Sequence, residues 1–206
     1  MIDVSNDGTL CTLTINRPDK ANSLTGDMLE ALCVGVEGAR DARAIILTGV
    51  GKVFSAGADL EAAKAGLALS PLWERLSSAI ARHPGLTIAA LNGTAAGGAM
   101  GMVLACYLRL AVPRPKVFYP VMKAGFLPQP SDPARLSALV GPSRAKMILM
   151  AGQKVPTEDA LTWGLIDKVV DPGELLQAAQ DLTQDVCSAA PEHARAIKGL
   201  IGERLR

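Results

Sequence analysis

Residues 86–101 read LTIAALNGTAAGGAMG, a short apolar run followed by a stretch with almost no side chain. The first six residues have the length and apolarity of a strand that is buried on both faces. Of the ten residues from 92 to 101, four are Gly and three are Ala. Because glycine inside a helix or strand costs about 0.5–1 kcal/mol relative to alanine, we expect another backbone or a ligand to contact the main chain here.

A second segment has the same form. Residues 44–60 read AIILTGVGKVFSAGADL, in which a buried strand at 44–48 leads to a Gly- and Ala-containing loop at 54–60. In parallel sheets the ligand crevice lies at the carboxyl ends of the strands, where helix N-termini present free N–H groups. Two such loops side by side would direct two backbone amides at one anionic oxygen, which is an oxyanion hole built without side chains.

The remaining segments alternate between the strand period and the helix period, with short connections. This alternation predicts one α/β domain over residues 1–206, without an internal linker or repeat. We expect strands at 9–15, at LRLAV (108–112) and at KVFYP (116–120), and a Pro-stiffened loop at 126–133. We expect helices after a Thr25 cap, from 61 to Arg82, from the Gly-rich run to about Leu108, at 143–152, after a Thr157 cap, at 172–188 and at 191–205.

Composition excludes several classes of protein. Hydrophobic residues make up 49% of the 206 residues, aromatic residues 3%, and the formal net charge is +1. Without a basic run or aromatic platforms, nucleic acid is not an expected partner. The cysteines are Cys11, Cys33, Cys106 and Cys187, which lie far apart without a C-x-x-C pair. Together with an N-terminus that lacks a basic signal region, they indicate reduced thiols and a cytoplasmic protein.

One stretch has the length of a membrane span. No charged residue occurs between Pro84 and Leu108, and such a run is long enough to cross a bilayer. However, the stretch opens with Pro-Gly, contains Asn92-Gly93 and is mostly Ala and Gly, which insert weakly. A buried strand, a turn and a buried helix fit these residues better.

Five motifs, in the same order along the chain, resemble the crotonase superfamily, the enoyl-CoA hydratase/isomerase family. They are TLTINRPDKANSLTGDML, IILTGVGKVFSAGADL, IAALNGTAAGG, MKAGFLPQPSDPARL and ALTWGLIDKVV. The resemblance implies a spiral of ββα units, usually assembled as trimers or dimers of trimers. It also implies an acyl-CoA ligand, with coenzyme A as part of the substrate and no further cofactor.

The resemblance also implies roles for individual residues. The backbone N–H groups of Ala58 and Gly98 would hold the thioester carbonyl, and the helix after Gly98 would add its positive end. Lys20, Ala21, Ser55 and Ala56 would border the adenine and pantetheine of coenzyme A.

The chain departs from the family's pattern at both catalytic glutamates. Gly101 stands where the first is expected and Val121 where the second is expected. Water addition needs a positioned acid and a base, so ordinary hydratase chemistry is not expected.

The helical part from about residue 142 is also expected to be shorter than in the family. Asp132 is the best substitute base, with a hydrogen bond to its own turn before Pro133 as the alternative.

Other polar residues have simpler interpretations. Tyr119 is expected in the core or at a trimer surface, and Lys123 in solvent. Asp59 and Glu61 are expected to cap a helix, and His83 and His193 to be exposed. The Gly-rich turn carries no serine nucleophile, and no metal-ligand cluster occurs.

Three hypotheses therefore remain for the activity. One is an acyl-CoA enzyme with isomerase or lyase chemistry and a non-standard acid. The second is a catalytically silent member that binds CoA esters or serves as a partner subunit, and the third is a purely structural protein without a ligand.

Overall fold

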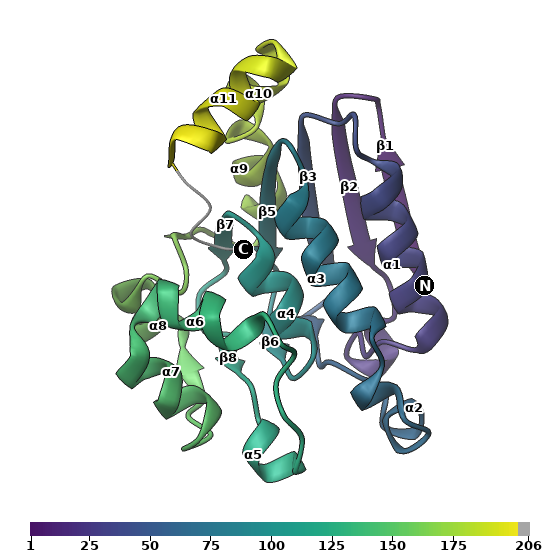
Figure 1. Ribbon diagram of the computed structural model, residues 1–206, viewed down its shortest axis with the longest axis vertical. Helices are drawn as coiled ribbons and strands as arrows, with labels where there is room; N and C mark the ends of the chain where they lie inside the picture. The colour runs from purple at the N-terminus through teal and green to yellow at the C-terminus, as the bar shows by residue number, and fades with distance from the viewer. Residues whose placement is uncertain (202–206) are drawn as a thin grey trace.

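The structure, a computed structural model, describes residues 1–201 and is built on two sheets. The larger sheet has six strands in the order β1-β2-β3-β5-β7-β10 (Figure 1). The β1–β2 pair is antiparallel and the other pairs are parallel. Its strands are β1 (Ile2–Asn6), β2 (Leu10–Ile15), β3 (Ala44–Gly49), β5 (Leu86–Leu91), β7 (Leu108–Ala111) and β10 (Lys168–Val169).

The central strands β3 and β5 of the larger sheet are buried on both faces. Because side chains alternate along a strand, Ile45 and Leu47 of β3 join the main core while Ile46 joins a second, smaller one. The main core lies under three helices that cross one face side by side (Figure 1). They are α1 (Gly26–Gly38), α3 (Leu72–Arg82) and α4 (Ala99–Ala105). On the other face, α9 (Leu175–Asp181) buries Leu175 and Ala179 in the smaller core.

A smaller sheet extends beyond the carboxyl ends of the larger one. Its strand order is β4-β6-β8-β9, with β4–β6 and β6–β8 parallel. β4, β6 and β8 each follow a strand of the larger sheet and precede a helix, which gives the expected spiral of ββα units. The four strands are β4 (Val53–Ser55), β6 (Thr94–Ala96), β8 (Lys116–Phe118) and β9 (Val155–Pro156).

The remaining helices complete the spiral and the C-terminal part. A short α2 follows β4, and α5 and α6 follow β8. Among the described residues, α11 ends at Ile201, so the end of the helix expected at 191–205 lies outside them. These helices are α2 (Leu60–Lys64), α5 (Val121–Ala124), α6 (Asp132–Val140), α7 (Pro142–Leu149), α8 (Thr157–Trp163), α10 (Gln184–Ser188) and α11 (Pro191–Ile201).

Several predicted boundaries are confirmed and others are wrong. Thr25 caps α1, since its hydroxyl accepts a hydrogen bond from the Met28 N–H at 3.3 Å. The helix expected from 61 to 82 is instead interrupted, with Gly66 at a φ of +102° between α2 and α3. The helix opened by the Gly-rich run ends at Ala105 rather than near 108. The expected helix at 172–188 is divided into α9 and α10.

Two polar residues differ from their predicted roles. The Thr157 hydroxyl does not cap α8 but donates to the Pro115 carbonyl at 2.9 Å. His83 is buried rather than exposed, because its ring contacts the Ala39 carbonyl at 3.1 Å and accepts from the Gly85 N–H. Burial lowers the pKa of His83, so the neutral ring is favoured. His193 is exposed, as expected.

In the part of the chain that the structure describes, no helix combines the length and apolarity needed to span a bilayer. The uncharged stretch from Pro84 to Leu108 is divided among β5, β6, α4 and the start of β7. This division agrees with the buried strand, turn and helix expected there.

Candidate active site

The two glycine-containing loops meet at the carboxyl ends of β4 and β6, which are parallel neighbours. A methyl group placed on Gly57 would lie 2.8 Å from the Ala96 carbonyl oxygen and 3.1 Å from the Gly98 nitrogen. Gly57 also has a φ of +90° and Gly97 a φ of +58°, conformations that favour glycine. The small residues are therefore explained by two backbones in close contact.

The backbone N–H groups at Ala58 and Gly98 have no hydrogen-bond acceptor among residues 1–201. Leu24 donates to the Gly57 carbonyl and accepts from the Asp59 N–H, both at 2.8 Å, so the bonds to Leu24 bracket Ala58. Within the described residues 1–201, neither the Ala58 nor the Gly98 N–H donates a hydrogen bond to protein. Two free donors on adjacent loops can bind an anionic oxygen.

Side-chain hydrogen bonds and an ion pair fix the first of these loops. The Ser55 hydroxyl donates to the Asn22 carbonyl at 2.8 Å and accepts from the Gly57 N–H at 3.2 Å. Arg17 forms an ion pair with Asp59 at 2.8 Å, and Asp59 caps α2, as predicted, by accepting from the Glu61 N–H. Arg17 opens the RPDKANSL motif, but nothing in the sequence around it indicates this role.

The residues expected to border coenzyme A lie on the 17–24 segment and the first loop. The Ala56 N–H donates to the Ala21 carbonyl at 3.0 Å, which brings these two residues together. Lys20 and Ala56 are exposed and Ala21 is half-buried, so all three are accessible to a ligand. Ser55 is fully buried, and its hydroxyl is engaged within the protein. Its contribution is therefore to hold the loop.

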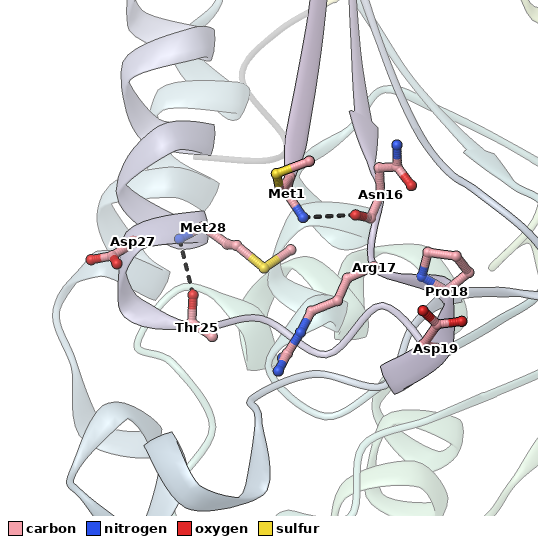
Figure 2. Close-up of a pocket in the computed structure, with 8 residues that line it drawn as sticks. All are labelled: Met1, Asn16, Arg17, Pro18, Asp19, Thr25, Asp27 and Met28. Carbon is pink, nitrogen blue, oxygen red and sulfur yellow. Dashed lines mark hydrogen bonds between the residues drawn. The ribbon is translucent and has the colours of Figure 1, made fainter.

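A surface depression of about 570 Å³ lies on the outer side of the 17–24 segment (Figure 2). Two hydrogen bonds connect residues that line it. The Met1 amino group donates to the Asn16 carbonyl, and the Met28 N–H donates to the Thr25 hydroxyl. None of Ala58, Gly98 and Asp132 lines this depression, so it is distinct from the meeting point of the two loops. Its lining residues are Met1, Asn16, Arg17, Pro18, Asp19, Thr25, Asp27 and Met28.

Trp73 of α3 covers Gly98. A methyl group on Gly98 would lie 3.0 Å from each of three indole ring carbons, so the ring faces the position of the absent side chain. The indole Nε1–H donates to the Leu67 carbonyl at 2.8 Å, which fixes the ring's orientation. This contact could not be predicted from the sequence, because a tryptophan at helical spacing is indistinguishable from any core residue.

Asp132 of α6 lies against Gly101 of α4, the position where the family's first glutamate is expected. A methyl group on Gly101 would lie 3.3 Å and 3.4 Å from the two carboxylate oxygens of Asp132. Asp132 is fully buried. A carboxylate from a different element thus occupies the space next to the missing side chain.

The Asp132 carboxylate has unequal oxygens. Tyr119 donates its hydroxyl proton to Oδ2 at 2.9 Å, whereas Oδ1 accepts no hydrogen bond among the described residues. The nearest cation to Oδ1 is Nη1 of Arg135, at 3.8 Å. Burial raises the pKa of Asp132 from 3.8 to about 6, against the opposing effects of Tyr119 and Arg135. The hydrogen bond to its own turn, expected as the alternative, is not formed by this side chain.

A second carboxylate, Glu74 of α3, anchors the start of α6 beside Asp132. It accepts hydrogen bonds from the Ser131 N–H at 3.2 Å, from the Ser131 hydroxyl, and from the Ser78 hydroxyl at 3.0 Å. Burial alone would raise the pKa of Glu74, but these bonds bring it below its usual value. Glu74 is therefore a satisfied anion that holds α6 in place.

The other residues near the expected glutamate positions carry no acid. Val121 is buried at the start of α5, and Lys123 is exposed, as predicted. Tyr119 is in the core, one of its two predicted locations. Within residues 1–201, no group of three or more His, Cys, Asp or Glu side chains could hold a metal ion.

Comparison with known proteins agrees with this architecture. The family model for enoyl-CoA hydratase/isomerase matches residues 5–205. A short-chain-enoyl-CoA hydratase from Clostridium acetobutylicum is 32% identical, the match covering 97% of this chain and 80% of that protein. A 4-chlorobenzoyl coenzyme A dehalogenase from an Arthrobacter species is 31% identical, covering 100% of this chain and 77% of that protein.

Solved structures show the same similarity. The crystal structure of an enoyl-CoA hydratase/isomerase from Pseudoalteromonas atlantica matches with a TM-score of 0.88 and 28% identity, covering 97% of this chain and 82% of that one. The fold and the site define an α/β spiral with two backbone loops converging at its strand ends. This chain belongs to the enoyl-CoA hydratase/isomerase family of the crotonase superfamily.

Proposed function

We propose that this protein processes acyl-CoA thioesters by polarising the thioester carbonyl between the backbone N–H groups of Ala58 and Gly98. The observation that carries the proposal is the close approach of the two loops: a methyl group built on Gly57 would lie 3.1 Å from the Gly98 nitrogen. Neither N–H donates a hydrogen bond to another described residue. The names of the relatives, a hydratase and a dehalogenase of CoA esters, support this substrate class.

Asp132 is the proposed proton-transfer group. Its carboxylate lies against Gly101, one helical turn from Gly98, where the family places its first glutamate. A pKa of about 6 is close to neutral pH, which suits a general base. Since Asp132 is fully buried, a bound acyl group must displace the protein atoms that cover it.

A single carboxylate is sufficient for a 1,3-proton shift. Asp132 would take the proton from the α-carbon of a 3-enoyl thioester, and the electron pair would move onto the thioester oxygen. The two N–H groups would stabilise that oxygen, and removal of one such donor costs about 2.7–4 kcal/mol. The carboxylic acid would then return the proton to the γ-carbon, giving the 2-enoyl isomer. Hydration needs a second acid–base group, and Val121 does not supply one.

Exchange of α-protons tests this function without knowledge of the acyl group. The protein is incubated with butyryl-CoA in D₂O, and deuterium incorporation is followed by mass spectrometry. We expect exchange with the wild type and a loss of about 10²–10⁴-fold with Asp132→Asn. Asp159→Asn, on the exposed part of α8, is the matched control and should exchange normally. Equal rates for both variants would remove Asp132 from the mechanism.

The alternative is a catalytically silent member that binds CoA esters or acts as a partner subunit. The glycine at 101, the valine at 121 and the complete burial of Asp132 favour it. Thermal melting with and without butyryl-CoA separates the two functions. Stabilisation by the ester without proton exchange would support the silent member, and absence of any shift would argue against both.

We also propose the family's trimer-based assembly for this chain. Light scattering of the purified protein tests it, with a mass three or six times that of one chain as the expected result. A stable monomer would contradict this assembly.

A further inference from the structure

The hydroxyl of Tyr119 is held from two sides. It donates its proton to Oδ2 of Asp132 at 2.9 Å and accepts from the Gln129 N–H at 3.4 Å. Because the Gln129 N–H uses the acceptor side of the oxygen, the hydroxyl proton is directed toward Asp132. Tyr119 is itself buried, so this geometry does not depend on solvent.

The result is an asymmetric carboxylate. Oδ2 is occupied by Tyr119, while Oδ1 is buried without a hydrogen-bond partner in the described part of the chain. A buried acceptor that lacks its partner costs about 1–3 kcal/mol, and such groups in native structures require an explanation. Both oxygens lie within 3.4 Å of the space that a Gly101 side chain would fill.

We propose that Tyr119 is a positioning residue: it holds Oδ2 of Asp132 and leaves Oδ1 as the oxygen that exchanges a proton with the acyl group. This inference rests on the proposed function of Asp132 and extends it to a residue that does not touch substrate. Tyr119 precedes Val121 by two residues, so it comes from the segment that has lost the family's second glutamate.

Two charged groups and one hydroxyl act on Asp132. Arg135 of α6 lies 3.8 Å from Oδ1, and Nη1 of this arginine also donates to the Ser77 hydroxyl at 3.0 Å. Glu74 of α3 acts on Asp132 through its charge and raises the pKa, and Tyr119 after β8 lowers it by donating a hydrogen bond. The facing residue of α4 is Gly101, which is uncharged. Tyr119 is thus the hydrogen-bond donor that stabilises the ionised carboxylate.

Replacement of Tyr119 by phenylalanine is the direct test. Without the donor, the ionised form of Asp132 is less stable, so the acidic limb of kcat/KM for α-proton exchange should move to higher pH. We expect a shift of about one pH unit, a tenfold change in proton affinity. We also expect kcat to fall about tenfold while KM changes less than twofold, because Oδ1 is no longer held in orientation.

The chain contains a matched control. It has two tyrosines, and the hydroxyl of the other, Tyr107, donates its proton to the Ala81 carbonyl at 2.9 Å. Tyr107→Phe removes the same atoms and should leave the pH profile unchanged. A Tyr119→Phe profile that coincides with that of the wild type would overturn the proposal, whatever its effect on folding stability.

A measurement on the wild-type protein covers the case in which Tyr119→Phe does not fold. With tyrosine labelled by ¹³C at Cζ, the Tyr119 signal should follow a titration near pH 6 that Asp132→Asn abolishes. A Tyr119 signal that does not titrate would overturn the positioning role. If the signal titrates but the protein exchanges no α-protons, Tyr119 does hold Asp132 and the proposed function fails instead.

Discussion

Two glycines, three residues apart at the start of α4, have different neighbours: one contacts an apolar ring and the other a carboxylate. Gly98 faces the carbons of the Trp73 ring at 3.0 Å, and Gly101 faces the Asp132 carboxylate at 3.3 Å. Because Gly98 has no side chain, the rigid apolar ring of Trp73 can pack beside its backbone N–H. At Gly101 it admits an anion from another helix.

The difference shows that a glycine can serve a site in two ways. At Gly98 the function proposed for the residue belongs to its own backbone, and the neighbouring Trp73 ring lies where a side chain would otherwise be. At Gly101 the residue contributes only space, and the proposed chemistry belongs to its neighbour. Substitutions at the two positions should therefore fail for different reasons.

Among the changes that separate these two glycines, the largest expected effect is loss of the Gly98 donor. Gly98 has a φ of −58°, which suits proline, so Gly98→Pro removes the N–H while keeping this dihedral angle. Gly98→Ala is the control, because it adds the same Cβ and keeps the donor. We expect α-proton exchange to be about 10²–10³-fold slower in the proline variant than in the alanine variant. Similar rates in the two would show that this N–H does not bind the thioester oxygen.

A smaller effect is expected in the pH dependence of stability. Burial raises the pKa of Asp132 from 3.8 to about 6, so between these pH values the folded state keeps a proton that the unfolded state has released. The wild type should lose about 3 kcal/mol from this group as pH rises from about 4 to about 6. Urea unfolding of wild type and Asp132→Asn measures it, and we expect the variant to lack this decline. Parallel stability curves would mean that Asp132 is not protonated in this range.

The smallest expected effects are on folding stability, where alanine at the two glycine positions should differ only in packing. In Gly98→Ala the new methyl lies 3.0 Å from a tethered indole, and overpacking of this kind costs about 1–3 kcal/mol. In Gly101→Ala the contact is 3.3 Å, and the gain of about 0.5–1 kcal/mol from alanine in a helix offsets part of the strain. Urea unfolding should rank Gly98→Ala below Gly101→Ala in stability, and the opposite order would contradict the comparison.

The backbone part of the site could be predicted from the sequence, and most of the side-chain part could not. Strand, glycine loop and helix form a local pattern, so the sequence predicts that the segments carrying Ala58 and Gly98 lie side by side, and the structure places them so. Binding of a thioester oxygen by their N–H groups stays a prediction, whereas the family follows from the five motifs. The contact between Asp132 and Gly101 joins residues 31 positions apart on two helices, which no local pattern specifies. Trp73 was missed for the same reason, because its contact with Gly98 lies between α3 and α4.

His83 shows how a local interpretation can be wrong. A histidine before Pro84 at the end of a polar helix is usually in solvent. Here the chain turns so that the ring reaches the Ala39 carbonyl and the Gly85 N–H, both of which it satisfies. His83 is buried because the end of α1 lies beside its ring. The sequence around His83 gives no information on the position of α1.

The Trp73 indole, which contacts the Gly98 position, can also report ligand binding through its fluorescence. The chain has two tryptophans, and the second, Trp163, lies on α8 under the Arg144 guanidinium. Trp163→Phe would leave Trp73 as the sole emitter, with its ring against the peptide plane at which an acyl thioester would arrive. Its emission wavelength and lifetime would then report occupancy of that position directly, for any acyl chain and without a turnover assay.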